Sequence, residues 1–444
     1  MPLGAALAFA GIEGSVPLLH GGQGCATYIR RYLISHFNEP LDIASSSFGE
    51  AATVFGGEAN LRDGIRNVVA GYRPQVIGVA TTCLAETIGE DVPAILHRLT
   101  QDAPDPADPA LPQLIPVSTP SYAGTHADGY RAAVAAILDA FTGGRALSES
   151  GAPGGDRLVL LPGIVSPADV RHLRELLDVF GAPCTVLPDI SDSLDGPAVP
   201  AYPKLHAGGT PLAEIAACGG APAAITLGGL TTPGTASGGE LLGRRFGVGH
   251  HVLPLPIGVR RTDAFVDLLR ELTGRVPDGW LDAERGRLVD AYVDGHKYVA
   301  GKRVGVFGDE DLVVGLASFL DEIGLQVVLA ASGGRSGRLR ESLAAVAPRH
   351  AGVAVVIEDA GFDQIDAAAE AAGVDLLVGH SKGYPTARRL GVPLVRVGLP
   401  IHDRLGGQRL LHLGYRGAQR MFDQIVNTLL ERAQDASAVG YAYM

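Results

Sequence analysis

The sequence predicts an α/β protein made of three doubly wound, Rossmann-like domains with mostly parallel sheets. The first observation is a series of short apolar runs that end in Gly, Ser, Thr or Asp, as buried parallel strands do. These runs are residues 75–82, 113–119, 157–163, 184–189, 223–229, 303–309, 326–331, 353–358, 375–380 and 393–398. The second observation is that helical patterns, such as 263–274 and 310–324, lie between the runs. Strands that alternate with helices are typical of stacked βαβ units.

Two changes in composition divide the 444-residue chain. Residues 142–156 resemble a linker of small residues, and a long charged helix is predicted over 282–298. We therefore expect three α/β domains, at residues 1–145, 155–255 and 300–444. A helical linker at 256–299 joins the last two domains. Ligands of such sheets bind beyond the carboxyl ends of the strands.

Composition argues against several classes of protein. The formal charge of −12 disfavours a general nucleic-acid or anionic-membrane surface. Four cysteines are too few for a disulfide scaffold in a chain of this length. No apolar stretch is long enough to span a membrane, and residues 1–11 resemble a first core helix more than a secretory leader. We therefore expect a cytoplasmic protein with reduced thiols and with no nucleic-acid or membrane partner.

The stretch "LLHGGQGCATYIRRYLISHF" (18–37) places Cys25 after a glycine cluster and at the start of an amphipathic helix. Gly21, Gly22 and Gly24 allow a sharp turn or a close approach of the backbone to a ligand. A helix N-terminus, with its free N–H groups, favours a negatively charged thiolate. No strand is predicted around the glycines and no G-x-G-x-x-G follows a strand, so we do not expect a dinucleotide unit here.

Cys83 directly follows the predicted strand 75–82, at a position where α/β folds hold ligand-binding groups. The acidic residues Glu86, Glu90 and Asp91 come after it. From position alone, the ordinary interpretation is that Cys83 is a small buried apolar residue and that the acids cap a helix.

A third stretch that leaves a predicted strand, residues 116–130, is rich in hydroxyl groups. Helix capping is their ordinary role, although Ser121 could also offer an oxygen to a metal centre. The cysteines form no C-x-x-C pair and the histidines show no tight zinc spacing, which argues against a self-contained zinc or ferredoxin site. Because Cys25 and Cys83 supply only half of a cluster's thiolates, a cluster here would lie at an interface completed by another chain.

Several further stretches complete a family pattern. They are "HGGQGC" (20–25), "SSSFGEAATVFGGEANL" (45–61), "TTCLAETIGEDV" (81–92), "STPSYAGTH" (118–126), "AGGT" (207–210), "AERGRLVDA" (283–291), "GKRVGVFGDEDLVVGLASFL" (301–320), "VPLVRVGLPIHDR" (392–404) and "LGYRGA" (413–418). Together they closely resemble the β-type subunit of nitrogenase component 1. The resemblance covers nearly the whole chain.

This resemblance implies an oxidoreductase in which the chain pairs with an α-type partner in an α2β2 heterotetramer. At each α–β interface an iron–sulfur cluster is held by cysteines of both chains, and in catalytic members it is an eight-iron P-type cluster (8Fe-7S). The cluster relays electrons from an ATP-hydrolysing iron protein to a substrate-reducing cofactor in the partner. By motif, Cys25 and Cys83 would be the metal ligands of this chain, and Ser121 would ligate one iron of the oxidised cluster. No catalytic residue is implied in this chain.

One departure from the family pattern leaves two functions open. Catalytic β-type subunits carry a third cysteine in a C-x-P-L-G motif, and here Met1 stands at the x position of "MPLG". Either the sequence begins inside the full protein, or the cluster has fewer ligands, as in scaffold subunits that assemble the iron–molybdenum cofactor and hold a 4Fe-4S cluster. The cysteine at position 83 favours the reductase, because some scaffold forms have glycine there. A reductase substrate could be N2 or a methylthio-alkane.

The other two cysteines, Cys184 and Cys218, match no ligand of the family. We expect both to be buried packing residues.

Overall fold

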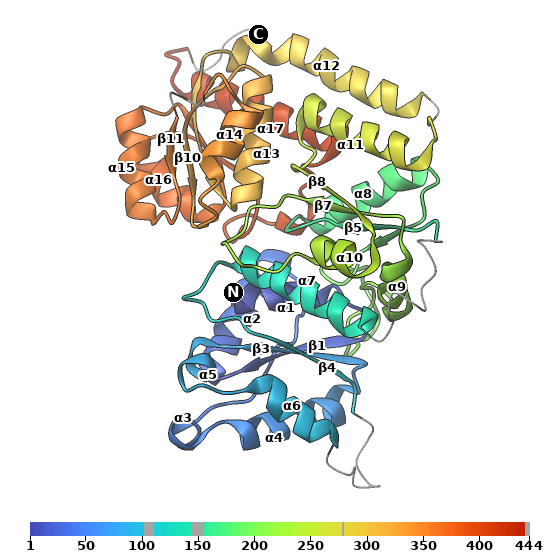
Figure 1. The fold of residues 1–444 in the computed structure, drawn as a ribbon. Coiled ribbons are helices and arrows are strands. Elements are labelled where there is room, and N and C mark those ends of the chain that lie inside the picture. Colours follow the sequence, from blue (N-terminus) through green and yellow to red (C-terminus); the bar gives the residue numbers. More distant parts are fainter. Residues whose placement is uncertain (102–110, 144–154, 278, 351, 353, 440–444) are drawn as a thin grey trace. The chain divides into compact units, whose positions relative to one another are not determined.

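Residues 1–101, 111–143, 155–277, 279–350, 352 and 354–439 are described by a computed structural model. They form an α/β structure with three parallel sheets, as the sequence predicts (Figure 1). Every predicted apolar run contains a strand. Most strands are shorter than their runs because the last residues of the run form the connecting loop.

The first sheet has the strand order β2-β1-β3-β4, and all its pairs are parallel. Its strands are β1 (Ser15–His20), β2 (Ala44–Ser45), β3 (Val76–Thr81) and β4 (Gln113–Val117). The register aligns β1 with β3 over their full length, with His20 opposite Thr81 at the carboxyl ends. Two segments from distant parts of the sequence therefore leave the sheet side by side.

Helices cover both faces of this sheet (Figure 1). On one face lie α1 (Pro2–Ala10) and α7 (His126–Thr142), and Phe9 of α1 packs so closely on β3 that a Cβ at Gly78 would collide with its ring. On the other face lie α4 (Glu58–Tyr72) and α6 (Val92–Gln101). Their apolar side chains form one buried core with those of β1 and β3.

The second sheet has the order β6-β5-β7-β8 and the third the order β11-β10-β9-β12-β13. Their strands are β5 (Leu158–Leu161), β6 (Cys184–Val186), β7 (Ala223–Leu227), β8 (Gly249–Leu253), β9 (Arg303–Gly308), β10 (Gln326–Ser332), β11 (Val355–Ile357), β12 (Leu376–Gly379) and β13 (Leu394–Arg396). In each sheet the first strand of the chain lies inside and later strands are added on both sides. This order is typical of doubly wound folds.

The remaining helices lie between these strands along the chain, except α17, which follows the last strand. They are α2 (Gln23–Phe37), α3 (Glu50–Phe55), α5 (Cys83–Thr87), α8 (Pro167–Val179), α9 (Leu212–Ala217), α10 (Gly238–Phe246), α11 (Gly258–Thr273), α12 (Trp280–Val299), α13 (Glu310–Glu322), α14 (Leu339–Val346), α15 (Phe362–Ala372), α16 (Tyr384–Leu390) and α17 (Gly414–Asp435). None of the described helices is both long enough and apolar enough to cross a membrane.

The glycine cluster does lie between a strand and a helix, so the expectation that no strand precedes it is wrong. β1 ends at His20, and α2 begins at Gln23. The sequence pattern misses β1 because its residues "SVPLLH" include a proline and follow an apolar helix, with no alternation to mark a strand. Its pairing with β3, which lies far along the chain, fixes it as a strand. The strands β2 and β8 were likewise not predicted.

The described chain divides into two compact units. The first contains Met1–Pro167, Pro183–Thr226 and Gly234–His251, and the second contains Ala168–Ala182, Leu227–Pro233 and Val252–Met444. Each of the three predicted domains contains one of the sheets, and their boundaries stay a prediction. The predicted charged helix is α12. Most of the predicted linker 142–156 lies outside the described residues.

We expect Gly78→Ala to lower the free energy of unfolding by about 1–3 kcal/mol, because the added methyl group overpacks the contact with Phe9. Urea denaturation followed by circular dichroism measures this change. The control is Gly71→Ala in α4, where a Cβ meets open space and the substitution should stabilise the helix by up to about 1 kcal/mol. Equal midpoints for the two variants would contradict the described packing of α1 on β3.

Candidate functional site

The three sequence-predicted site residues follow three neighbouring strands at one edge of the first sheet. β1, β3 and β4 are adjacent and parallel, and their carboxyl ends are His20, Thr81 and Val117. Cys25, Cys83 and Ser121 lie in the segments that begin there. The sheet topology thus brings to one edge residues that the sequence separates.

Cys25 lies in the first turn of α2. The helix is capped by the backbone of Gly22, whose carbonyl accepts a hydrogen bond of 3.1 Å from the Cys25 N–H. Cys25 is exposed, and a Cβ at either Gly22 or Gly24 would meet open space. Its thiol is therefore accessible to a ligand or a second chain.

Gly21 lies in the glycine-rich turn of residues 21–25, called here the Cys25 loop. It packs tightly against the segment that carries Cys83. Its φ of 153° and a steric conflict between any Cβ and the Thr82 hydroxyl both require glycine. The N–H and the hydroxyl of Thr82 each donate to the carbonyl of His20, at 3.0 and 3.1 Å. The residue before Cys83 is thus fixed to the residue that begins the glycine cluster.

Cys83 is the first residue of α5 and is half-buried. Its Sγ accepts a hydrogen bond of 3.2 Å from the backbone N–H of Ser121. The structure therefore brings Cys83 and Ser121 into direct contact. The interpretation of Cys83 as a buried apolar residue does not fit, because the residue is only half-buried and its sulfur accepts a hydrogen bond.

Glu86, in the same short helix, joins the ends of β3 and β4. One of its carboxylate oxygens accepts hydrogen bonds of 2.5 Å from the hydroxyls of both Thr81 and Ser118. Thr119 donates two hydrogen bonds to Thr81, from its N–H to the Thr81 hydroxyl at 2.8 Å and from its hydroxyl to the Thr81 carbonyl at 2.6 Å. The end of β4 is thereby held against the end of β3.

The capping interpretation is confirmed for two of the polar residues. Asp91 accepts a hydrogen bond of 3.1 Å from the N–H of Ala94 and caps α6. Thr125 caps α7 in a capping box, in which the Thr125 N–H donates to Asp128 at 2.7 Å. Glu86 instead bridges strand ends, and Glu90 approaches His20.

The chain segment before α1 belongs to the same site. Burial lowers the pKa of the Met1 amino group to about 6, and the nearby Asp128 carboxylate and Cys83 side chain oppose this effect. Met1 stands next to the position at which the family pattern carries its third cysteine.

The sequence does not reveal which residues lie beneath the glycine cluster. Ser46 contacts both His20 and Gly21, and the ring of Phe48 packs edge-on against His20. The only sequence signal for them was that both lie in a stretch of the family pattern. Their spatial role depends on β2, which two residues define.

The expectation that Cys184 and Cys218 are buried packing residues is confirmed only in part. No disulfide joins any of the four cysteines, all of which are described. Cys218 is buried, and burial raises the pKa of its thiol to about 12, so it stays protonated at neutral pH. Cys184 is only half-buried, in β6. Within the described residues, no group of three or more His, Cys, Asp or Glu side chains could hold a metal ion.

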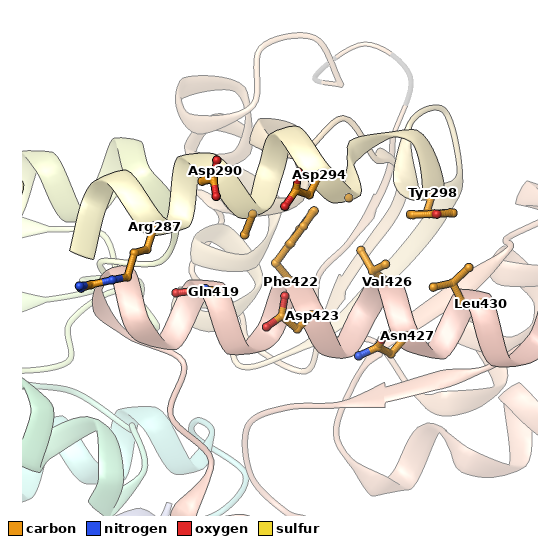
Figure 2. Close-up of a pocket in the computed structure, with 12 residues that line it drawn as sticks. Arg287, Asp290, Asp294, Tyr298, Gln419, Phe422, Asp423, Val426, Asn427 and Leu430 are labelled. Atoms are coloured by element: carbon orange, nitrogen blue, oxygen red, sulfur yellow. The ribbon is translucent and has the colours of Figure 1, made fainter. Parts of the chain in front are cut away.

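A separate groove of about 450 Å³ lies between α12 and α17 (Figure 2). Phe422, Val426 and Leu430 form its apolar part, and a Cβ at Gly295 would collide with the Phe422 ring, so this glycine lets the helices pack closely. Asp290, Asp294 and Asp423 give the groove an acidic lining, and burial raises the pKa of Asp423. None of the sequence-predicted site residues lines this groove.

The sequence is similar to proteins of one family. The family described as "Nitrogenase component 1 type Oxidoreductase" matches residues 1–430. The nitrogenase molybdenum-iron protein beta chain of Methanococcus maripaludis is 35% identical over 97% of this chain and 93% of its own length. The nitrogenase vanadium-iron protein beta chain of Trichormus variabilis is 35% identical over 96% and 92% of the two chains. The molybdenum-iron beta chain of Frankia alni is 37% identical over 97% and 81%.

A solved structure described as "Nitrogenase Cp1 at pH 6.5" has the same fold. It superimposes with a TM-score of 0.92 and 32% identity, over 100% of this chain and 95% of the other. A second nitrogenase Cp1 chain, at pH 5, has a TM-score of 0.68 at 16% identity over 97% and 88% of the two chains. This second likeness concerns the fold alone.

We expect Glu86→Ala to lower the free energy of unfolding by about 1–3 kcal/mol, because two hydroxyl donors lose their acceptor. It should also speed the alkylation of Cys83, since the end of β4 that carries Ser121 is released. Urea denaturation and mass spectrometry of the alkylated thiol measure the two effects. The control Glu86→Gln retains an acceptor oxygen and should lose less stability. An alkylation rate in Glu86→Ala equal to that of the unaltered protein would contradict this role.

Proposed function

Because this chain belongs to the nitrogenase component 1 family, as a β-type subunit of an oxidoreductase complex, we propose that it holds half of an interface iron–sulfur cluster. The other half would come from an α-type partner in an α2β2 heterotetramer. In this proposal the chain relays electrons from an ATP-hydrolysing iron protein to a cofactor in the partner, in the cytoplasm. The reaction itself takes place in the partner.

The observation that carries this proposal is the placement of Cys25 and Cys83. Two adjacent parallel strands deliver both cysteines to the same sheet edge, and each cysteine lies in the first turn of a helix. Several of the first N–H groups of a helix have no partner within the helix, so such groups can donate to cluster sulfurs. Such hydrogen bonds tune the potential of a cluster.

The donor set fits a cluster shared between two chains. Cys25 is exposed, and Cys83 is partly open, so both thiols can reach a group outside this chain. Cys25 and Cys83 would be the thiolate ligands, and Ser121 stands beside Cys83 as an oxygen donor. When bound, the cluster would supply one-electron transfer. The residues of this chain hold the ligands in place: Thr82 fixes the glycine turn, and Glu86 fixes the end of β4.

The cluster type proposed is the eight-iron P-type. The similar relatives are named as beta chains of molybdenum-iron and vanadium-iron nitrogenase proteins, at the same 35% identity, so likeness in this subunit does not select the metal of the partner's cofactor. The substrate, which could be N2 or a methylthio-alkane, is likewise a property of the partner. The proposal for this chain is therefore the electron relay.

Anaerobic co-purification with the α-type partner tests this proposal, with iron quantification and EPR of dithionite-reduced and oxidised samples. We expect about eight interface irons for each αβ pair and signals that depend on oxidation. About four irons with an ordinary reduced cubane signal would replace the relay by a scaffold for cofactor assembly. A complex without iron would exclude both.

We further expect Cys25→Ala and Cys83→Ala each to abolish the interface iron, because a shared cluster needs every thiolate. Ser121→Ala should keep the iron of the reduced cluster and change the EPR signal of the oxidised state. The matched control is Cys184→Ala, which removes another half-buried thiol and should leave the iron unchanged. Full iron in Cys25→Ala and Cys83→Ala would rule out these ligands.

A further inference from the structure

His20 is a completely buried histidine that directly precedes the Cys25 loop. It ends β1, its side chain has no exposed surface, and the glycine cluster follows it directly. Nδ1 of the ring lies 3.0 Å from the Ser46 hydroxyl oxygen, which also accepts a hydrogen bond of 2.9 Å from the Gly21 N–H. The ring of Phe48 packs edge-on against it, with centroids 4.7 Å apart. The imidazole is thus held in one orientation.

The other ring nitrogen faces Glu90, which lies in the segment after Cys83. Nε2 is 3.6 Å from the Glu90 carboxylate, a close polar contact that is too long for a hydrogen bond. The Glu90 side chain is only 8% exposed, and its other oxygen accepts a hydrogen bond of 2.5 Å from the N–H of Gly57. Glu90, in the segment after Cys83, therefore contacts both His20 and the turn between α3 and α4.

Stability alone does not explain this pair. Taking a carboxylate and an imidazole out of water is costly, and a well-packed apolar pair of the same volume is often at least as stable. Burial lowers the pKa of His20, and the neighbouring Glu90 opposes that effect. Nε2 makes no hydrogen bond within the described part of the chain, so the pair is not optimised as a hydrogen bond. What the pair does provide is a fixed distance between two loops.

We propose that His20 and Glu90 form a positioning pair, which fixes the Cys25 loop against the Cys83 segment so that both thiols are in place before a cluster is inserted. This proposal rests on the proposed function for the identity of the ligand, and on the geometry of this chain for the positioning itself. Ser46 orients His20, and Gly57 orients Glu90. Neither His20 nor Glu90 is a cluster ligand in this proposal.

The test uses the full chain, co-purified anaerobically with its α-type partner, and the variants His20→Ala, Glu90→Ala and the double variant. Two readouts are the rate of iron loss to a chelator and, in the cluster-free chain, the alkylation rate of Cys83 relative to Cys184. We expect each single variant to lose iron about tenfold faster, as removal of a residue that orients a metal ligand does. Cys83 should become more reactive, and the double variant should resemble the singles, because the pair acts as a unit.

Two further variants separate positioning from general stability. Glu90→Gln keeps an acceptor for the Gly57 N–H and should restore part of the iron retention. His412→Ala removes a second buried histidine, which lies 3.3 Å from Asp169 in the other compact unit. It should lower the melting temperature without changing iron loss or Cys83 alkylation.

Two results would overturn the proposal. One is equal iron loss in His20→Ala and His412→Ala, compared at the same interval below each melting temperature. The other is an unchanged alkylation rate of Cys83 in both His20→Ala and Glu90→Ala. A normal complex that contains no iron would defeat the proposed function instead, and the alkylation rates would still decide whether the pair positions the thiols.

Discussion

The parallel pairing of β1 with β3 is the constraint on which the candidate site depends. Its register places His20 opposite Thr81, and the next residue on the β3 side, Thr82, donates two hydrogen bonds to the His20 carbonyl. A slip of one residue would exchange the faces of every side chain in the strand. It would also separate Gly21 from Thr82, whose close contact only glycine permits. The positions of both candidate cysteines follow from this register.

Polar side chains add contacts that hold the segments after the strands in the positions set by the strand register. Glu86 collects hydroxyl donors from the ends of β3 and β4, while Glu90 lies between His20 and the Gly57 N–H. Most donors in these contacts have an acceptor, and hydrogen bonds among buried polar groups favour one arrangement of the loops. The site is accordingly held by groups that come from four separate segments and are not themselves candidate ligands. Such support is what a metal site needs around its ligands.

In the proposed function, the chain holds only half of a cluster, and its described residues fit such a half-site. Within the described residues it gathers no set of three metal-ligating side chains, yet it presents an exposed Cys25 and a partly open Cys83 at one edge. A cluster shared between chains needs just such an open half-site. The chain is 35% identical both to a beta chain named for molybdenum and to one named for vanadium.

The sequence by itself determined the α/β class, most of the strands, the place of Cys25 at a helix start and the place of Cys83 at a strand end. These features depend on local patterns of apolar residues and glycines, which a short window of sequence contains. Only the tertiary structure decided that β1 is a strand, that Cys83 meets Ser121 and that His20 meets Glu90. Each of these contacts joins residues far apart in the chain, so it depends on strand order and register, which no local pattern encodes.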